Sequence, residues 1–360
     1  MPRRTVARTT ARTTALVVGI VAMAAMVTAA APNTSGLRVY EGTIGQRAIV
    51  VLLDAANPTR VSGVYFYAST GRDIALTGSR TRFDERDPSE VANPGAAPTA
   101  RFTGTWSTNS TTFVGSWKRL SGNAPSNNVR FHRVAFSASN TKARIRSTTR
   151  SARSPLGTAR YRMPIVTGTA PAWIGTRIVG DFNNAALLDD SIDAVIAQYK
   201  QNGGGITGID FDVVHNGDDI LDLRVRAQTM GAYPDQFVED RLYDLRTGAH
   251  LRAGDLFAST TKPALVKLLQ TRVDAIVAKA SKADPATADE LRSLVDSSGA
   301  TINDRELASF SITSTGVVFH HDFGFPHVAQ ALEPDGDVSV TWRELAPFPR
   351  TGGLLDPLAR

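Results

Sequence analysis

The sequence predicts an α+β protein, in which a small all-β domain is followed by a domain with helices packed on an antiparallel sheet. Short β-like runs, separated by turn residues at a spacing of roughly 10 residues, predict the first domain. Strict alternation of apolar and charged residues within residues 206–257 predicts the antiparallel sheet, because alternation gives each strand one apolar face. Apolar residues at helical spacing in residues 263–277 predict a helix that covers this sheet.

Length and composition bound the organisation of the chain. A chain of 360 residues is long enough for two domains with separate cores. The absence of cysteine excludes disulfides, a thiol nucleophile and cysteine-based metal sites, so an exported fold of this sequence depends on its core alone. We predict a targeting segment, a β domain, a linker, an α+β domain and a tail, at residues 1–31, 37–136, 137–160, 161–350 and 351–360.

The N-terminal residues have the order of a secretory signal. Four arginines precede an apolar run at residues 15–31, and no carboxylate occurs in this segment. The small residues Thr28 to Ala31 supply a cleavage site. The alternative is an uncleaved anchor, since the apolar run is close to the shortest length that spans a bilayer. We therefore expect a secreted or periplasmic protein, which contacts a membrane only if residues 15–31 remain attached.

The charge of the chain does not predict a nucleic-acid partner. The formal net charge is +6, and the four arginines of residues 1–31 leave +2 for the remainder. The distribution is uneven, because residues 91–180 hold 13 Lys or Arg and no Asp or Glu, whereas residues 181–360 hold 16 basic and 27 acidic residues. This asymmetry indicates that the two halves attract each other or that the middle faces an anionic polymer, and a solvated linker is the alternative for its densest part.

The β domain contains two copies of an F-x-G-x-W pattern. They occur at Phe102–Trp106 and Phe113–Trp117, and they predict neighbouring strands whose glycines allow close backbone approach. Trp106 and Trp117 are candidate glycan-binding residues, because an apolar ring face suits a sugar face. The alternative is that they are paired aromatic residues of a small core.

The predicted linker and the second domain follow from composition and local signals. Residues 137–160 are rich in Ser, Thr and Arg and hold almost no large apolar residue, so we expect them not to pack. A helix is predicted between a cap at Asp190 or Ser191 and the glycines that begin at Gly203. The pair Asn216-Gly217 predicts the turn of a hairpin. Further elements are predicted as a strand at 237–245, helices at 263–277 and 285–295, a strand region at 310–323, a closing segment at 342–348 and a loose tail after it.

The order of motifs in the second half resembles a known family. The segments GAYPD at 231–235, YDLRTG at 243–248 and GDLF at 254–257 are followed by Pro326-His327 and by WRELAPF at 342–348. This order is similar to the RsiV-like extracellular domain, the outer part of lysozyme-sensing anti-sigma factors, which also occurs at the front of some peptidoglycan deacetylases. The resemblance covers about residues 161–348 and implies a bacterial cell-envelope protein.

Three departures limit what the resemblance implies. About 14 residues precede the apolar run, too few for a sigma-binding segment, and no motif of a deacetylase domain is present. The best-known sensors have a histidine in the loop that here reads Gly231 to Asp235. We therefore expect a binding module without catalytic activity and without a cofactor. Its ligand is an envelope protein, with lysozyme one candidate, or a cell-wall glycan, and its candidate contact residues lie in two loops, namely Tyr233, Pro234, Asp235, Phe325 and His327.

Two clusters of polar residues carry the alternative function, a cell-wall hydrolase. One is the histidine cluster at 320–327, which predicts a metal site only if its members converge, and neighbouring strand residues point to opposite faces. The other is a set of five aspartates between Asp210 and Asp222, most of them on the polar face of the hairpin. The chain contains no nucleophile elbow, zinc-protease or phosphate-loop motif, so we predict no catalytic residue and no metal ligand. The hydrolase alternative requires that Asp and His from both segments meet in one pocket.

Overall fold

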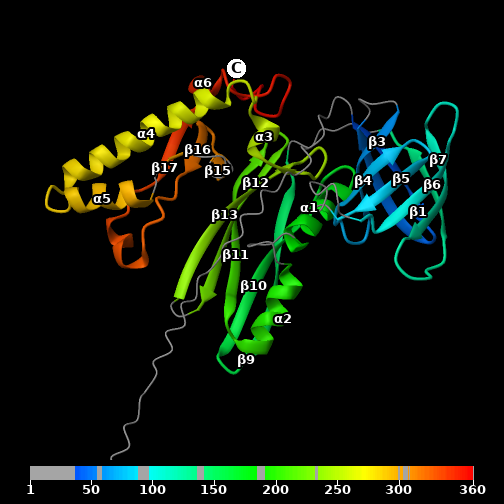
Figure 1. Cartoon of the computed structure of the whole chain (residues 1–360), viewed down its shortest axis with the longest axis horizontal. Helices are drawn as coiled ribbons and strands as arrows, with labels where there is room; N and C mark the ends of the chain where they lie inside the picture. Colours follow the sequence, from blue (N-terminus) through cyan, green and yellow to red (C-terminus); the bar gives the residue numbers. More distant parts are fainter. Residues whose placement is uncertain are drawn as a thin grey trace, which may run out of the picture.

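The chain folds as a mostly β protein with some helices (Figure 1). The computed structural model describes residues 37–54, 59–87, 97–135, 142–184, 191–231, 234–298, 301–302, 307 and 309–359. The predicted targeting segment therefore lies outside the described residues. The predicted α+β class is wrong, because the described chain consists of a closed barrel, a six-stranded mixed sheet and a three-stranded sheet. In the described residues of the barrel segment all regular elements are strands, and the helices pack on the two other sheets.

The first unit is a closed barrel of eight antiparallel strands. The strands are β1 (Leu37–Ile44), β2 (Arg47–Asp54), β3 (Arg60–Tyr67), β4 (Ile74–Ser79), β5 (Arg82–Arg86), β6 (Ala100–Trp106), β7 (Thr112–Arg119) and β8 (Asn127–Arg133). The barrel closes where β1 pairs with β8, with Tyr40 opposite Arg133. Its interior is filled by aromatic rings, including Tyr65, Phe83 and Phe102, because every second residue of a barrel strand points inward.

The second sheet has six strands in the order β14-β13-β12-β11-β10-β9. They are β9 (Arg144–Ser154), β10 (Gly157–Thr167), β11 (Gly205–Gly217), β12 (Ile220–Met230), β13 (Pro234–Asp244) and β14 (His250–Leu251). The sheet is mixed and not purely antiparallel, since β10 and β11 run parallel. A parallel pair needs a crossover, and here the crossover contains α1 (Trp173–Asn184) and α2 (Ile192–Asn202).

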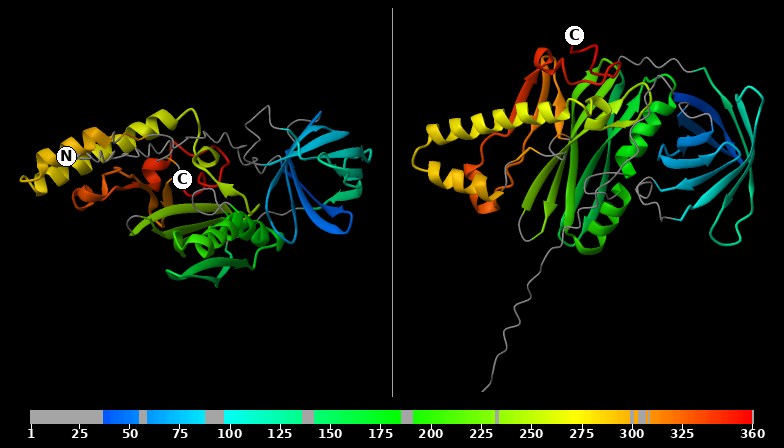
Figure 2. Two further views of the ribbon diagram at one scale, coloured as in Figure 1. Left: turned by 60° about the horizontal axis from the view of Figure 1, so that its bottom comes forward. Right: turned by 45° about the horizontal axis from the view of Figure 1, so that its top comes forward.

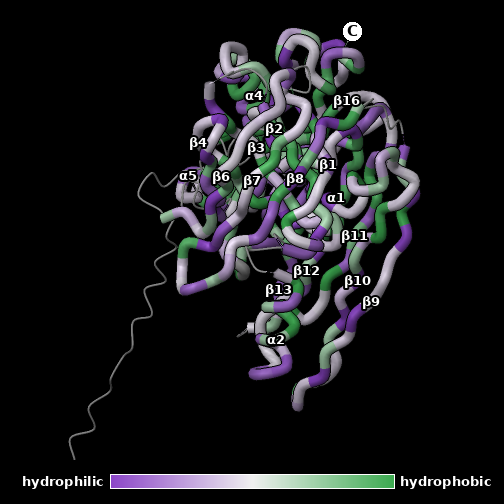
Figure 3. Tube along the Cα trace, turned by 90° about the vertical axis from the view of Figure 1, so that its right-hand side faces the viewer, coloured by the Kyte–Doolittle hydropathy of each residue, from purple (hydrophilic) through white to green (hydrophobic). Residues whose placement is uncertain are grey.

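The segment predicted as a linker is instead a β-hairpin. β9 pairs along its whole length with β10, from Gly157 opposite Ser154 to Thr167 opposite Arg144. A polar sequence is suited to this place because β9 is an edge strand with a single partner, and its charged residues protect the open edge. Figure 3 shows β9 largely in purple and white, the colours of hydrophilic and intermediate residues. Polarity in residues 144–154 therefore marks an exposed strand.

The third unit is a three-stranded sheet with several helices, of which α4 and α5 are the longest. It contains β15 (Phe310–Ile312), β16 (Gly316–His320) and β17 (Asp337–Thr341), together with α3 (Ala253–Leu256), α4 (Lys262–Ala283), α5 (Ala288–Ser298), the 3-10 helix η4 (His327–Leu332) and α6 (Trp342–Leu345). The predicted loose tail is wrong, because Leu355 is fully buried in the same core. Its apolar side chain is thereby removed from water.

Two local predictions had different outcomes. α2 begins after Ser191, whose hydroxyl accepts the backbone N–H of Ala194, and it ends at Gly203 with a φ of 72°, which confirms the predicted helix. The turn between β11 and β12 lies two residues after the predicted Asn216-Gly217 turn. Its central residues are Asp218 and Asp219, which have positive φ values of 52° and 62°. Aspartate tolerates this conformation, so Asn216 is free for another role. Its side chain bonds both backbone groups of Ala143.

The six-stranded sheet lies between the other two units (Figure 2). α1 and α2 pack on one face, and the outer wall of the barrel joins the same core through Val39, Leu52 and Phe66, with Phe66 against Trp173. The three-stranded sheet faces β11, β12 and β13 on the opposite face. The barrel therefore docks by its side, and its end near the β6–β7 turn is not part of this contact.

Candidate functional site

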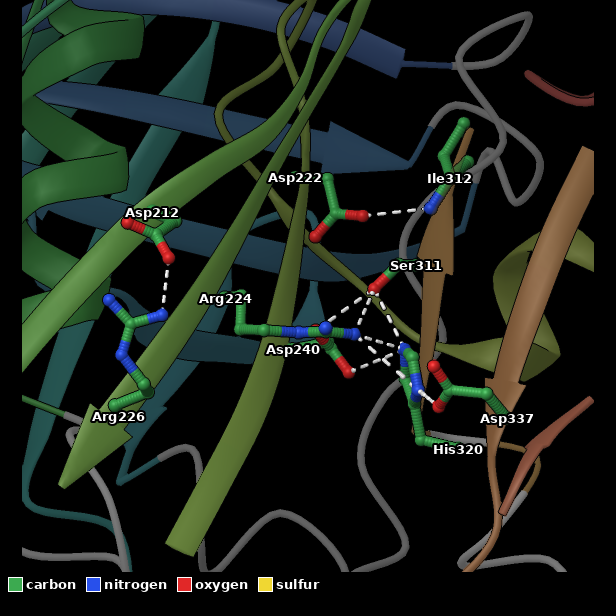
Figure 4. A network of polar contacts seen from close by, with 9 residues as sticks. All are labelled: Asp212, Asp222, Arg224, Arg226, Asp240, Ser311, Ile312, His320 and Asp337. Carbon is green, nitrogen blue, oxygen red and sulfur yellow. Dashed lines mark hydrogen bonds and ion pairs between the residues drawn. The ribbon is translucent and has the colours of Figure 1, made fainter. Parts of the chain in front are cut away.

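A polar cluster joins the six-stranded sheet to the three-stranded sheet (Figure 4). Arg224 on β12 donates to Asp240 on β13 at 3.0 Å and to the hydroxyl of Ser311 on β15 at 2.8 Å. His320 on β16 contacts Ser311 through Nε2 at 2.9 Å and Asp337 on β17 through Nδ1 at 2.5 Å. Five strands thus place one polar group each at the same point.

Three members of this cluster have the order of a nucleophile, a base and an acid. Ser311, His320 and Asp337 are within hydrogen-bond distance in that sequence. Ser311 is, however, only 2% exposed, and its hydroxyl donates its hydrogen to Asp240 at 3.1 Å. Its proton is then not directed at the imidazole, and a substrate carbonyl has no access to the oxygen. The described arrangement is that of an interlock between two sheets.

Removal of the Ser311 hydroxyl tests the interlock. We expect Ser311→Ala to lower the free energy of unfolding by about 1–2 kcal/mol, because Arg224 and Asp240 lose a shared hydrogen-bond partner. Urea denaturation of this variant and of Ser339→Ala, an exposed serine on β17, provides the comparison. Equal stability of the two variants would show that the buried hydroxyl contributes nothing.

Asp222 is a buried carboxyl beside this cluster. One oxygen accepts the backbone N–H of Ile312 on β15 at 2.8 Å, and within the described part of the chain the other oxygen has no hydrogen-bond partner. Burial raises the pKa of Asp222 to about 7 in spite of the hydrogen bond from Ile312, and the negative charge of Asp240 contributes to this rise. The remaining hairpin aspartates are more exposed, and Asp210 and Asp212 pair with Arg162 and Arg226.

The pocket that the hydrolase alternative requires is not formed by these residues. Of the predicted clusters, Asp222 and His320 both lie at the interface but have different partners, Ile312 and Ser311, whereas His321 is buried against Phe323 and Asp322 accepts the N–H of Gly324. Neither of two cavities on the surface is lined by Ser311 or His320. In the ranges that the structure describes, no group of three or more His, Asp or Glu side chains could hold a metal ion.

A second buried cluster was not anticipated from the sequence. Tyr243 donates to Asp181 at 2.9 Å, and the buried guanidinium of Arg241 lies 3.6 Å from the same carboxylate. His250 lies 4.0 Å from Asp181, and burial lowers the pKa of this histidine to about 4. The imidazole is therefore neutral at pH 7. The acid partner is 69 residues away in the sequence, which is why local patterns do not indicate it.

An open cavity of about 280 Å³ lies at one end of the barrel, which we call the barrel mouth. Its charged lining consists of Arg38, Arg60, Arg80, Arg133 and Asp54. The floor is made by Tyr40, Leu53, Val61 and Trp106, and polar residues 108–110 of the β6–β7 turn complete the wall. Four arginines and one aspartate give the lining a formal charge of +3. The sequence indicated only Trp106, since the arginines come from four separate segments.

The two tryptophans proposed as a glycan groove do not share one. Trp106 pairs with Phe113 and Trp117 pairs with Phe102, so they are separated by four residues along the strand pair, or roughly 13 Å. Trp106 packs against Tyr40 at the barrel mouth, whereas the indole of Trp117 donates to Glu85 at 3.0 Å. Both rings pack on the barrel core.

The loop residues predicted to bind a ligand have different environments. Pro234 and Asp235 are exposed at the start of β13. Phe325 is 5% exposed and belongs to the core of the third unit, so its ring is not available at the surface. Tyr233 and the side chain of His327 lie outside the described residues. Of the five loop residues predicted to contact a ligand, only Pro234 and Asp235 are both described and exposed.

Comparisons with known proteins give a likeness in structure. No family model matches the chain, and no curated protein matches it. A DUF3298 family member from Bacteroides fragilis is 13% identical with a TM-score of 0.40, over 62% of this chain and 97% of that one. A DUF3298 family protein from Pseudomonas aeruginosa is 14% identical with a TM-score of 0.41, over 61% and 97%. These neighbours are of the RsiV-like type. A likeness of this strength carries no function to this chain.

No helix in the described part of the chain is both long and apolar enough to span a membrane.

Proposed function

We propose that this chain is a non-catalytic binding module that is exported to the bacterial cell envelope and engages a cell-wall glycan. The observation that carries the proposal is the barrel mouth, an open cavity that combines an apolar floor with arginines and hydroxyl-bearing residues. Such a combination is suited to a sugar, which presents both C–H faces and hydroxyl groups. The arginine-rich and apolar order of residues 1–31 supports the export that we propose.

The position of the cavity supports a binding role. The barrel docks on α1 through its outer wall, so the mouth is left accessible at one end of the molecule. Its lining comes from strands of a closed barrel and from the short β4–β5 and β6–β7 turns, which fix the backbone positions of the lining residues. A rigid site loses little conformational entropy when a ligand binds.

Binding to cell-wall material tests the proposal. We expect residues 32–360 to co-sediment with insoluble peptidoglycan and associated glycans at about 0.15 M salt, because cavity contacts are screened less than surface charges. Immobilised lysozyme serves as a protein ligand in parallel. Retention on lysozyme alone would replace the glycan by a protein partner. Loss of all retention between low and physiological salt would contradict the proposal.

A hydrolase is the second candidate, because Ser311, His320 and Asp337 are in triad order. A fluorophosphonate probe labels a serine only if its hydroxyl is accessible and activated by a base. We expect no labelling of the folded chain and no release of soluble fragments from cell-wall material. Labelling of the chain that disappears in Ser311→Ala would favour the hydrolase.

A further inference from the structure

We infer that the barrel mouth is an oxyanion site, and that its ligand is a glycan whose sugars carry carboxylate or phosphate groups. This inference rests on the proposed function and specifies its ligand. The argument depends on two arginines, Arg38 and Arg133, that point into the cavity from neighbouring strands.

The two arginines are held close together by the register of the barrel. Arg133 shares the inward face of β8 with Phe131, and Arg38 shares the inward face of β1 with Tyr40. Tyr40 is opposite Arg133, so Arg38, two residues before Tyr40, is the diagonal neighbour of Arg133 across the strand pair. Diagonal positions of this kind are about 7–8 Å apart. In the part of the chain that the structure describes, neither guanidinium forms an ion pair with a carboxylate.

Arg80 has a different role at the same mouth. Its guanidinium donates to the hydroxyl of Ser110 and lies 5.9 Å from the ring of Trp106, while its carbonyl accepts the indole N–H of Trp106 at 2.8 Å. These contacts fasten the β4–β5 turn to the β6–β7 turn. Arg80 thus builds the cavity, whereas Arg38 and Arg133 are available to a ligand.

An anion between Arg38 and Arg133 would remove an unfavourable interaction. Two like charges on diagonal strand positions repel each other, and only Asp54 opposes the four positive charges of the lining. A carboxylate or phosphate accepts paired N–H donors from guanidinium groups, which gives short charge-assisted hydrogen bonds. The geometry therefore favours an oxyanion over a neutral sugar.

The remaining lining specifies a sugar and not a nucleobase. One face of the Trp106 ring is covered by Arg80, and the ring also contacts Phe113 and Phe131, so it offers no platform on which a base could stack. The apolar groups left for the C–H groups of a sugar are those of Leu53 and Val61. Thr108, Asn109 and Ser110 supply hydroxyl and amide groups for ring hydroxyls. A cavity of about 280 Å³ is suited to one sugar unit of a chain.

Calorimetric titration of residues 32–360 with three probes tests the inference. The probes are a galacturonate oligomer with carboxylates, a glycerol phosphate oligomer and a neutral N-acetylglucosamine oligomer. We expect one or both anionic probes to bind more tightly than the neutral one, and the better of them identifies the source of the oxyanion. We expect Arg38→Gln combined with Arg133→Gln to weaken that binding about 100-fold, or about tenfold for each arginine.

The matched control is Arg119→Gln combined with Arg130→Gln, which removes the same charge from exposed positions of β7 and β8. We expect this control to bind as the unaltered chain does. The mouth variant should also unfold at an equal or higher temperature, because a like-charge repulsion is relieved. An equal loss of binding in both double variants would overturn the inference. Binding of the neutral probe alone would overturn the oxyanion site and leave the proposed function, whereas failure of every probe together with failure to co-sediment would overturn both.

Discussion

Asp222→Asn is expected to remove the pH dependence of folding stability that Asp222 contributes. Burial raises the pKa of Asp222 from 3.8 to about 7. Between these values the folded state keeps the proton and the unfolded state releases it, so stability falls as the pH rises from about 4 to about 7. The titration of Asp222 therefore lowers the free energy of unfolding by about 3 kcal/mol as the pH rises from 5 to 8.

Asparagine removes the charge and keeps the contact. Its carbonyl oxygen can still accept the N–H of Ile312, so the link between β12 and β15 remains. We expect Asp222→Asn to be more stable than the unaltered chain at pH 8, with a smaller difference at pH 5. Urea denaturation at both pH values measures the two differences.

Asp212→Asn is the matched control on the same sheet. The hydrogen bond from Arg226 lowers the pKa of Asp212, and this carboxylate is 54% exposed. A lowered pKa gives stability that is lost only as the pH falls through that pKa, well below pH 5. The control should therefore keep the slope of the unaltered chain from pH 5 to pH 8. An unchanged slope in Asp222→Asn would mean that Asp222 does not titrate in this range.

Arg177→Ala is expected to lower the free energy of unfolding by about 3 kcal/mol. The side chain is 5% exposed and donates to both oxygens of Asp73, at 2.9 and 2.6 Å, and to the carbonyl of Thr247 at 2.7 Å. It thus joins the β3–β4 turn of the barrel to α1 and to the turn after β13. Its loss leaves a partly buried carboxylate without its counterion. The estimate is at the lower end of the range for buried pairs because Asp73 is 32% exposed.

The neighbouring Arg72 provides the control for this prediction. Arg72 pairs with Asp87 at 3.4 Å, and their side chains are 55% and 43% exposed. Exposed pairs of this kind contribute at most about 1 kcal/mol, so Arg72→Ala should change stability little. Denaturation curves of the two variants give the comparison, and limited proteolysis shows whether the barrel separates from α1. Equal curves would mean that Arg177 does not hold the barrel in place.

Signals that act within a few residues predicted the local elements. Ser191 and Gly203 delimit α2, and the apolar stripe after Pro263 forms α4, because a cap or a helical face depends on residues that are neighbours in sequence. The alternation from Ile209 to Val213 likewise predicted β11. The sequence predicted the candidate binding residues only in part. Trp106 lines the barrel mouth, whereas Phe325 is buried in the core of the third unit.

The predictions that were wrong depended on partners far along the chain. Residues 144–154 are polar because they form an edge strand, and composition alone does not separate an edge strand from an unpaired linker. The parallel pair of β10 and β11 changes the class of the sheet, although each strand has the same pattern that an antiparallel strand has.

By itself, the sequence determined the apolar faces, the helix ends, the absence of disulfides and the arginine-rich N-terminal order. The tertiary structure decided which charges meet. Arg177 and Asp73 are 104 residues apart, and Arg38 and Arg133 become neighbours only because the barrel closes between β1 and β8. Electrostatic interactions depend on distance in space and on the loss of water around each group, and neither quantity exists in a sequence before the chain has folded.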